Sequence, residues 1–166
     1  NVVESEMSRQ PLSNASSGFQ YSRLGEIPVW HVPMGGRTAS PGKRSLGYLG
    51  FHIKSLLWAC RKDQAYDIII APSPPLSIGL VAWLMSRRFH ATCVYIVQEL
   101  YPDFAIHRGL IRSRVATRIL EKLERLVYSK CDAVVTIADR FTRIVASRCA
   151  CPQKVLTIPN FVDAEF

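Results

Sequence analysis

The chain has 166 residues, enough for one hydrophobic core of ordinary size, and 48% of them are hydrophobic, which excludes a disordered protein. The formal net charge of +8 favours an anionic partner, such as a membrane surface, a phosphate-bearing ligand or nucleic acid. No apolar run reaches the roughly 18 residues that a transmembrane helix needs, so none is predicted.

The N-terminal part of the chain has an irregular pattern. Residues 1–18 are polar and rich in Ser and Asn, which predicts a flexible lead-in. Residues 26–33 alternate between apolar and polar side chains, and the prolines at their limits favour an edge strand. Residues 35–44 are typical of a loop. Residues 43–64 follow as a predicted helix, whose apolar positions are Leu46, Leu49, Ile53, Leu56 and Leu57.

The predicted helix over 43–64 carries aromatic side chains beside cations, a combination typical of helices that lie on a membrane surface. The alternative is a core-facing helix with a solvated basic face. The positive charge of the chain is compatible with an anionic lipid surface. If the helix lies on a membrane, the residues expected to contact it are Lys43, Arg44, Lys54, Trp58, Arg61 and Lys62.

Apolar runs and helical patterns alternate through the C-terminal hundred residues. Short apolar runs predict buried strands over 66–71, 91–98, 132–138 and 154–160. Helical patterns lie between them, over 75–89, 112–130 and 139–149. Because fully apolar strands are typical of parallel sheets, the sequence predicts an α/β fold with a doubly wound, mostly parallel, Rossmann-like sheet.

Two of these helices carry more specific expectations. The helix over 112–130 is amphipathic, and the one over 139–149 has Asp139 as its expected N-cap. Residues 108–148 hold ten Lys/Arg and four Asp/Glu, and Glu121 and Glu124 interrupt the basic stripe. Exposed aromatic residues and a nucleic-acid motif are missing there, which favours a solvated or lipid-facing surface over nucleic-acid binding. The expected apolar face of 112–130 consists of Val115, Ile119, Leu123 and Leu126.

The five cysteines are odd in number and irregularly spaced, and paired C-x-x-C motifs are absent, so no zinc site is predicted. Cys149 and Cys151 are separated by one residue, a spacing that allows chelation. The alternative is that all are reduced cytosolic thiols, three of them in apolar segments. The cysteines are Cys60, Cys93, Cys131, Cys149 and Cys151.

Ligands of open parallel sheets bind beyond the carboxyl ends of the strands, where this chain places polar residues after two strands. After 91–98 come Glu99, Tyr101, Asp103 and His107. Glu99 is a candidate general base or charge stabiliser, and the alternative is that Glu99 and Asp103 cap or pair within the fold. His107 is a weaker candidate ligand contact.

The turn after 66–71 consists of Ser73, Pro74 and Pro75 and leads into a predicted helix. Two interpretations of it are compatible. In the first, backbone N–H groups at the helix start bind an anion or a hydroxyl group. In the second, the prolines form a rigid turn that sets the direction of the helix. Glycine-rich nucleotide loops of the G-x-G-x-x-G and Walker types are absent, and so is the G-x-S-x-G elbow of hydrolases.

Four segments occur in a characteristic order: "YDIIIAPSPPLSIGLVAWLMSRR", "VYIVQELYPDFAIHRGLI", "LEKLERLVYSKCDAVVTIADRF" and "KVLTIPNFVD". Together they resemble the N-terminal domain of GT-B glycosyltransferases of the family-4 type, with the closest likeness to enzymes of colanic acid, capsule and O-antigen assembly. The resemblance covers about residues 20–166. It implies a Rossmann-like acceptor-side domain over 19–158 and the start of an interdomain linker over 159–166.

The resemblance also implies a function. Such enzymes transfer a sugar from a nucleotide-sugar donor with retention of the anomeric configuration, without a metal or other cofactor. Their acceptor is commonly a lipid-linked saccharide at the inner face of the cytoplasmic membrane, so we expect a cytoplasmic, peripheral membrane protein with an anionic membrane surface as a partner. Nucleic acid is not expected as a partner.

Single positions can be carried over from the family. Glu99 lies where the family usually has Asp, so the carboxylate is kept with one methylene more. Ala138 lies where the family often has Ser, and Asn160 lies at the expected hinge to the second domain. Combining the residue pattern with the resemblance, we expect these residues to contact substrate: Ser73, Pro74, Pro75, Tyr101, Asp103, His107 and Asn160.

Family members begin with a strand, a Gly-rich loop and a helix, and they end with a donor-binding domain that carries paired glutamates. We expect this chain to be a partial domain without these parts and therefore inactive alone. Two copies could pair across an exposed sheet edge as a homodimer. The alternatives to a transferase are a sugar-nucleotide 2-epimerase of the same plan and a non-catalytic membrane or protein docking module.

Overall fold

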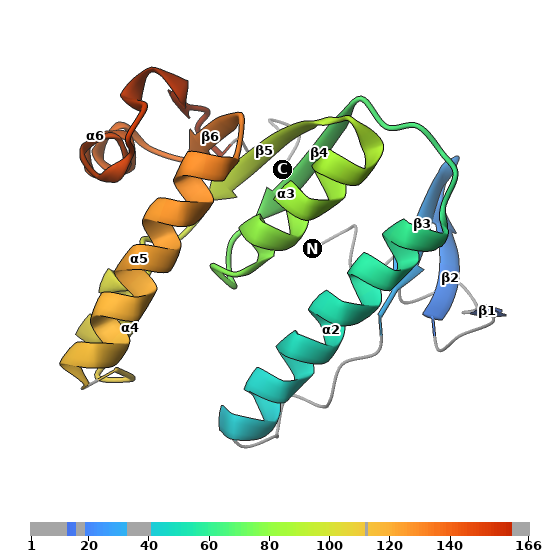
Figure 1. Cartoon of the computed structure of the whole chain (residues 1–166), viewed down its shortest axis with the longest axis horizontal. Coiled ribbons are helices and arrows are strands. Elements are labelled where there is room, and N and C mark those ends of the chain that lie inside the picture. Colours follow the sequence, from blue (N-terminus) through green and yellow to red (C-terminus); the bar gives the residue numbers. More distant parts are fainter. Residues whose placement is uncertain (1–12, 16–18, 33–40, 112, 161–166) are drawn as a thin grey trace, which may run out of the picture. The chain divides into compact units, whose positions relative to one another are not determined.

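The computed structural model describes residues 13–15, 19–32, 41–111 and 113–160, and for residues 13–15 and 41–45 it describes the backbone alone. The chain divides into two compact units, residues 1–58 and 59–166. Figure 1 shows the elements of both units, coloured along the sequence. Each unit has a sheet of its own, one antiparallel and one parallel.

The first unit contains a small antiparallel sheet in the order β1 (Ser13–Ala15), β2 (Phe19–Leu24) and β3 (Ile27–His31). Gly25 makes the turn between β2 and β3 with a φ of 58°, a conformation that favours glycine. The strand predicted over 26–33 is confirmed as β3, and it lies at a sheet edge, where the missing N–H of a proline is tolerated. β1 pairs with β2, so the prediction of a flexible lead-in over 1–18 is wrong for residues 13–15.

Helix α2 (Pro41–Arg61) confirms the helix predicted over 43–64 and begins two residues earlier. The predicted loop over 35–44 therefore loses its last four residues to the helix, while residues 35–40 lie outside the described residues. Trp58 of α2 has its ring 6.0 Å from that of Trp30 on β3, and this contact joins the helix to the hairpin of the same unit.

The second unit is built on a parallel sheet in the order β4-β5-β6-β7, which confirms the predicted α/β fold. Its strands are β4 (Ile68–Pro72), β5 (Thr92–Val97), β6 (Ala133–Thr136) and β7 (Val155–Thr157). The helices are α3 (Ile78–Phe89), α4 (Asp103–His107), α5 (Arg114–Lys130), α6 (Asp139–Arg148) and the 3₁₀ helix η1 (Pro152–Lys154). All four strands predicted in this half of the chain are present, each somewhat shorter or shifted.

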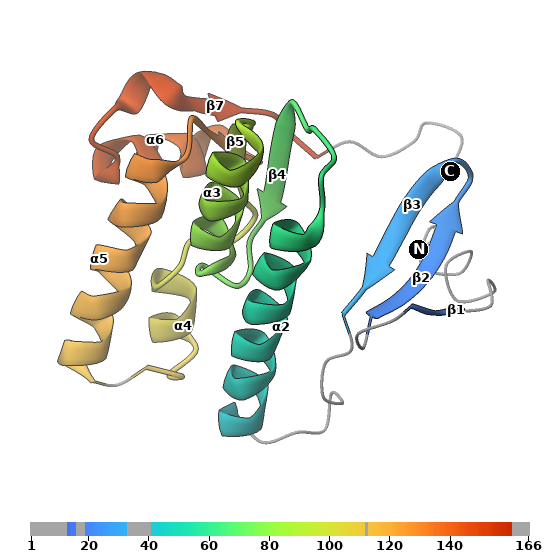
Figure 2. The ribbon, with the colours of Figure 1, turned by 45° about the vertical axis from the view of Figure 1, so that its right-hand side comes forward.

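The strand order of the second unit fixes where its helices lie. Successive strands are neighbours, so right-handed crossovers place α3, α5 and α6 on one face of the sheet, as one half of a doubly wound arrangement. Figure 2 shows α3 and α5 as one layer beside the strands. On the opposite face, Ile68 and Ile70 of β4 are 55% and 60% exposed. Helices α3, α5 and α6 therefore cover one face of this sheet.

Three details of the helices differ from the prediction. α3 begins at Ile78, three residues later than expected, because the turn after β4 continues to Ser77. Asp139 is the first residue of α6, and Ala138 occupies the N-cap position with extended backbone, so the predicted cap is wrong. Asp139 still favours the helix, because a carboxylate in the first turn complements the helix dipole. The five-residue helix α4 was not predicted.

The core of the second unit lies between the sheet and the helix layer. Tyr95 of β5 and Tyr128 of α5 are both 1% exposed, with ring centroids 6.3 Å apart. A Cβ atom at Gly79 of α3 would overlap the side chain of Val127, so glycine allows α3 and α5 to approach closely here. Cys93, Cys131 and Cys149 are buried, as expected for three of the cysteines.

The buried face of α5 is not the predicted one. Glu124, Val127 and Tyr128 are buried, whereas Val115 and Ile119 are 65% and 60% exposed and Leu126 is 41% exposed. Of the four predicted face residues, only Leu123 packs against the core. Val115, Ile119 and Leu126 do lie on one side of α5, as the pattern predicts. That side does not face the sheet, because Tyr128 and Val127 on another side of the helix fill the core.

Candidate active site at the carboxyl edge of the sheet

The strand register brings the strand-end residues to one edge of the second unit. Pro72 pairs with Ile96, and Thr136 pairs with both Val97 and Thr157. The segments that follow β4, β5, β6 and β7 therefore leave the sheet at the same edge. This carboxyl edge is where the sequence predicted a ligand site, and Ser73, Glu99 and Asn160 all follow strands that end there.

The turn after β4 is held by Ser73, which is 4% exposed. The Ser73 hydroxyl accepts a hydrogen bond from the Gln98 backbone N–H at 3.0 Å, and the Ser73 N–H donates to the Ile96 carbonyl at 2.9 Å. Burial raises the pKa of Tyr95, and a hydrogen bond with Ser73 opposes this shift. Ser73 thus ties the ends of β4 and β5 together one residue before Glu99.

The first two N–H groups of α3 are bound within the chain. The N–H groups of Ile78 and Gly79 donate to the carbonyls of Pro75 and Leu76 at 3.1 and 3.3 Å. Of the two expectations for this turn, the geometry fits the rigid turn, and it contradicts anion binding by these two N–H groups. Pro74 is exposed and Pro75 is half-buried, so both still border the carboxyl edge.

Glu99 is the second residue of the strand-end loop, residues 98–102, between β5 and α4. Its side chain is half-buried, and its carboxylate forms no hydrogen bond or ion pair with any residue that the structure describes. The backbone beside it is fixed, since the Gln98 N–H is bound by Ser73. A carboxylate on a fixed backbone without a partner of its own is free to bind a ligand or a developing positive charge.

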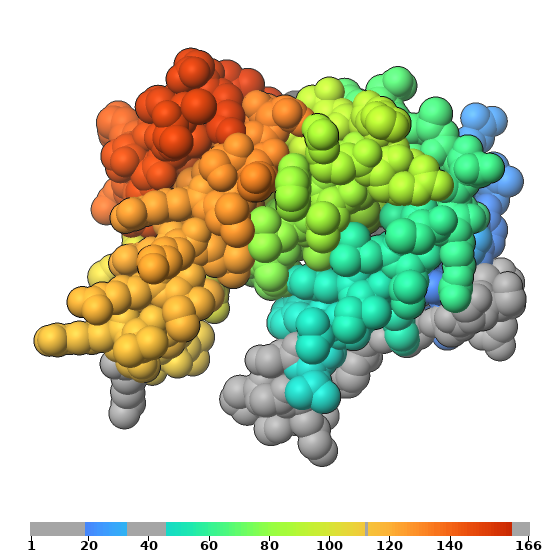
Figure 3. All heavy atoms as spheres, viewed as in Figure 1, coloured from blue at the N-terminus to red at the C-terminus, as the bar shows by residue number. Residues whose placement is uncertain are grey.

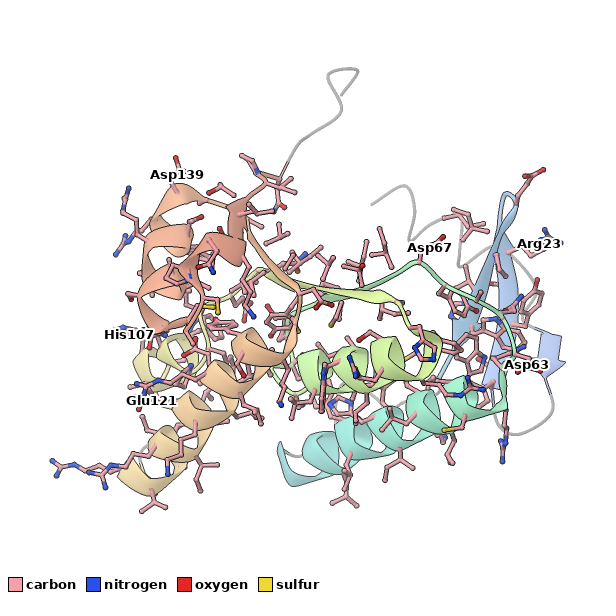
Figure 4. All side chains as sticks on the ribbon, turned by 45° about the horizontal axis from the view of Figure 1, so that its top comes forward. Arg23, Asp63, Asp67, His107, Glu121 and Asp139 are labelled. Atoms are coloured by element: carbon pink, nitrogen blue, oxygen red, sulfur yellow. The ribbon has the colours of Figure 1, made fainter. Side chains whose placement is uncertain are left out.

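The rest of this segment anchors the loop. Tyr101 packs against the core, and Pro102 is fully buried. The Asp103 carboxylate accepts a hydrogen bond from Arg148 of α6 at 2.6 Å, so it is engaged within the fold. His107 lies at the end of α4 with an exposed side chain (Figure 4). A ligand contact by Tyr101, Asp103 or His107 stays a prediction.

Arg148 is the centre of a charge network that sequence reasoning missed, here called the helix junction: Asp103, Glu124, Tyr128 and Arg148. Its guanidinium also donates to both carboxylate oxygens of Glu124, at 3.1 and 3.3 Å. Tyr128 donates its hydroxyl proton to Glu124 at 2.9 Å. The junction therefore joins α4, α5 and α6 and fixes the helix that follows the strand-end loop.

Burial governs the electrostatics of the helix junction. Glu124 is 1% exposed, and this burial raises its pKa above the usual value, while the charge of Arg148 opposes the shift. Burial also raises the pKa of Tyr128. Hydrogen bonding to Asp103 and the charge of Glu124 raise the pKa of Arg148 despite its burial. The expectation of a solvated stripe is wrong for Glu124. Its spacing of four residues from Tyr128 on α5 is the sequence signal that it shares the buried face.

A chain of hydroxyl groups closes the same edge at β6 and β7. The Thr142 hydroxyl lies 2.5 Å from both the Thr136 and the Thr157 hydroxyl groups. Thr136 is fully buried, so these groups hold the start of α6 against the two strand ends. Asn160 follows β7 and is exposed. Its predicted contact with a ligand stays a prediction.

The residues expected to contact a membrane lie on or directly after α2. Lys43 and Arg44 fall where the structure describes the backbone alone. Lys54, Trp58 and Lys62 are half-buried, and Arg61 is exposed. None of these surroundings decides between a lipid-facing and a solvated face, so this assignment stays a prediction. No helix among the described residues is both long enough and apolar enough to cross a membrane.

A cavity of about 350 Å³ lies at the opposite, amino edge of the parallel sheet. Trp83, Lys130 and Asp132 are among its lining residues, and none of the predicted ligand contacts lines it. Asp132 is already engaged there, since its carboxylate accepts the Cys93 N–H at 2.8 Å. Across the described residues, no group of His, Cys, Asp or Glu is arranged to hold a metal ion.

Comparison with known proteins places this fold. A comparison with curated proteins finds no match. The family model for the glycosyl transferase 4-like domain matches residues 10–160, which includes all residues that the structure describes and every strand of the parallel sheet. The parallel sheet flanked by helices agrees with that assignment. The chain therefore belongs to the family of glycosyl transferase 4-like domains.

Proposed function

We propose that this chain is the acceptor-side part of a retaining glycosyltransferase that moves a sugar from a nucleotide-sugar donor to a lipid-linked saccharide. The pathway class we propose is bacterial envelope polysaccharide assembly, of the colanic acid, capsule or O-antigen kind. The family match supports a glycosyltransferase. The observation that carries the site is Glu99, a carboxylate without a described partner beside a fixed backbone at the carboxyl edge.

In this proposal, the acceptor-side domain extends to residue 158, and residues 159–166 begin the linker to a donor-binding domain. The donor binds mainly to that second domain, and the acceptor lies across the carboxyl edge. Asn160 lies beside the cleft between the domains. No metal or other cofactor takes part. The enzyme works at the cytoplasmic face of the membrane, where its lipid-linked acceptor is.

Glu99 acts on the reacting sugar. As the bond from the anomeric carbon to the leaving diphosphate breaks, positive charge develops on the sugar ring. A nearby carboxylate stabilises that charge, or it accepts the proton of the attacking acceptor hydroxyl. Ser73 and the helix junction keep the strand-end loop in place from its two sides, so that this carboxylate does not have to be ordered at the moment of reaction.

The test is a Glu99→Gln variant of the transferase that carries this domain. We expect kcat to fall by about 10²-fold or more, as for loss of an acid–base or electrostatic group, with little change in KM. Asp67→Asn is the matched control, because Asp67 has an exposed side chain at the amino edge (Figure 4). An unchanged kcat in Glu99→Gln would remove Glu99 from the chemistry.

A second experiment tests the division of labour between the two domains. The 166-residue chain, incubated with a radiolabelled nucleotide sugar and a polyprenyl-diphosphate-linked sugar, is expected to give no transfer product. The transferase with its donor-binding domain serves as the positive control. Product formation by the chain alone would contradict the proposed division.

A further inference from the structure

Two of the buried cysteines form a pair at the amino edge of the parallel sheet. The Sγ atoms of Cys93 and Cys131 lie 3.4 Å apart, within hydrogen-bonding distance for two thiols. The structure describes all five cysteines, and this is the one contact between two thiols among them. Both side chains belong to the core, at 0% and 1% exposed. Cys93 and Cys131 are here called the thiol pair.

The backbone holds the thiol pair together. Cys93 lies on β5, and Cys131 follows α5 and precedes β6 by two residues. The Asp132 N–H donates to the Cys93 carbonyl at 2.9 Å, and the Cys93 N–H donates to the Asp132 carboxylate at 2.8 Å. Adjacent strands bonded in this way lie about 4.8 Å apart, which is within the Cα separation that disulfide bonds require. The fold therefore presents two thiols that a rotation of their side chains brings to bonding distance.

The surroundings make the two thiols unequal. The hydrogen bond with Cys131 lowers the pKa of Cys93 more than burial raises it, and the charge of Lys154 also lowers it. For Cys131, the hydrogen bond with Cys93 and burial both raise the pKa. Lys154 is held beside the pair, because its ammonium group donates to the Cys131 carbonyl at 2.8 Å. Cys93 is therefore the thiol that ionises first, and a neutral Cys131 remains beside it.

A cavity approaches the thiol pair from solvent. The cavity at the amino edge, of about 350 Å³, is lined by residues that adjoin both cysteines in the chain: Thr92, Lys130 and Asp132. All three are exposed, so the cavity is open to solvent. Helices α3 and α5 lie side by side (Figure 3), and residues from the ends of both line the cavity. The thiols therefore lie directly behind the cavity wall, where a small opening of the structure admits a molecule not much larger than water.

We propose that the thiol pair is an oxidation site of this domain, at which a small hydroperoxide such as hydrogen peroxide joins Cys93 and Cys131 in a reversible disulfide. This inference goes beyond the proposed function, because it assigns a modification to the amino edge, away from the carboxyl edge and Glu99. Single buried cysteines are usually inert. A second thiol at 3.4 Å changes this, because it captures the first oxidation product before oxidation proceeds further.

The reaction consumes one hydroperoxide for each thiol pair. The Cys93 thiolate attacks an oxygen of hydrogen peroxide, the O–O bond breaks, and hydroxide leaves and takes up the proton that Cys93 lost. Cys93 is then a sulfenic acid. The Cys131 sulfur attacks the Cys93 sulfur, an S–S bond forms, and the hydroxyl group leaves as water with the Cys131 proton. The two thiols together lose two electrons, and the peroxide is reduced to two molecules of water.

The other three cysteines are placed differently. Cys60 and Cys151 are exposed, and the buried Cys149 thiol donates to the Cys151 carbonyl at 3.4 Å. The disulfide would close the segment between Cys93 and Cys131, which carries the strand-end loop, α4 and α5. A bond between residues 38 positions apart restricts the unfolded chain. Oxidation should therefore make this unit harder to unfold.

The test is peptide mapping of the full chain after treatment with hydrogen peroxide and alkylation of the remaining thiols. Trypsin releases Cys93 in the peptide 89–108 and Cys131 in the peptide 131–140, and neither peptide holds another cysteine. We expect these two peptides to be joined by a bond that dithiothreitol cleaves, with a mass two hydrogens below the sum of the separate peptides. The same treatment in urea should lose this selectivity, because the unfolded chain no longer holds the two thiols together.

The matched control is Cys60→Ser/Cys151→Ser, which removes both exposed thiols and keeps the thiol pair. It should form the same linked peptides, and its midpoint of thermal unfolding should rise by about 10 °C on oxidation. Cys131→Ala should instead leave a sulfenic acid at Cys93, which dimedone labels. Two peptides that stay separate while Cys60 and Cys151 are oxidised in the wild-type chain would overturn the inference. So would a midpoint that does not rise in the linked control.

Discussion

Glu124 on α5 and Glu99 beyond β5 are glutamates of the same unit with opposite surroundings. Glu124 is 1% exposed and is bound by Arg148 and Tyr128, whereas Glu99 is half-buried and has no partner among the described residues. The helix junction therefore uses its carboxylates to hold the fold, and the strand-end loop keeps one available. The difference shows that strand-end position and the absence of a partner, rather than residue type, mark the candidate catalytic group.

The largest stability effect is expected at Arg148. Arg148→Met leaves Glu124 buried without its counter-charge and also releases Asp103. Breaking a buried ion pair from one side typically costs about 3–5 kcal/mol. Urea unfolding of the wild-type protein and of the Arg148→Met variant measures this loss. A loss below about 1 kcal/mol would mean that the helix junction contributes little, and the contrast with Glu99 would weaken.

The pH dependence of the same variant sharpens the contrast. Because burial raises the pKa of Glu124, the folded state retains a proton that the unfolded chain has already lost. Stability from this group is present below about pH 4.3, the ordinary glutamate pKa, and is lost as pH rises to the raised pKa. Without Arg148 the shift is larger, so the stability deficit of Arg148→Met should grow as pH rises. A deficit independent of pH would contradict this account.

Ser73 tests how firmly the strand-end loop is held. Ser73→Ala removes the acceptor of the Gln98 N–H, and because this hydrogen bond is only partly buried its loss costs about 0.5–1.5 kcal/mol. Thermal unfolding measures the cost, and Ser147→Ala, an exposed position on α6, is the control. Equal stability of the two variants would show that the loop is anchored elsewhere.

Gly79 tests the packing of the helix layer. Gly79→Ala places a methyl group against Val127 and Tyr95, and overpacking of this kind costs about 1–3 kcal/mol. The better helix propensity of alanine offsets about 1 kcal/mol of this cost. The expected net loss is small but measurable by denaturant unfolding. The double variant Gly79→Ala/Val127→Ala relieves the overlap but leaves a cavity at Val127, so we expect it to recover none of the lost stability. A double variant with a higher free energy of unfolding than the wild-type chain would contradict the close-packing argument.

The sequence was sufficient for the order of the strands and helices of the second unit and for the edge at which its strand-end segments meet. Short apolar runs and helical periods differ enough to separate β4, β5, β6 and β7 from α3, α5 and α6. Parallel strands bring their carboxyl ends together by geometry alone, so the positions of Ser73 and Glu99 along the chain were enough to assign both to one edge.

What the sequence did not provide depends on tertiary packing. Periodicity located the apolar stripe of α5 but not the side that faces the sheet, because Val127 and Tyr128 determine that side. Arg148 and Glu124 are 24 residues apart, and only the packing of α6 against its neighbours brings them together. A partner of this kind has no local pattern, so the helix junction could not be predicted and Glu124 was assigned to a solvated stripe.

The central claim is that Glu99 serves the reaction and the helix junction serves the fold. The most direct measurement takes Glu99→Gln and Glu124→Gln in the transferase side by side, with kcat and the free energy of unfolding determined for each. We expect Glu99→Gln to lose about 10²-fold or more in kcat with stability within about 0.5 kcal/mol of wild type. We expect Glu124→Gln to lower the free energy of unfolding more than Glu99→Gln does. A Glu99→Gln enzyme that keeps its kcat, or that unfolds more readily than Glu124→Gln, would contradict the claim.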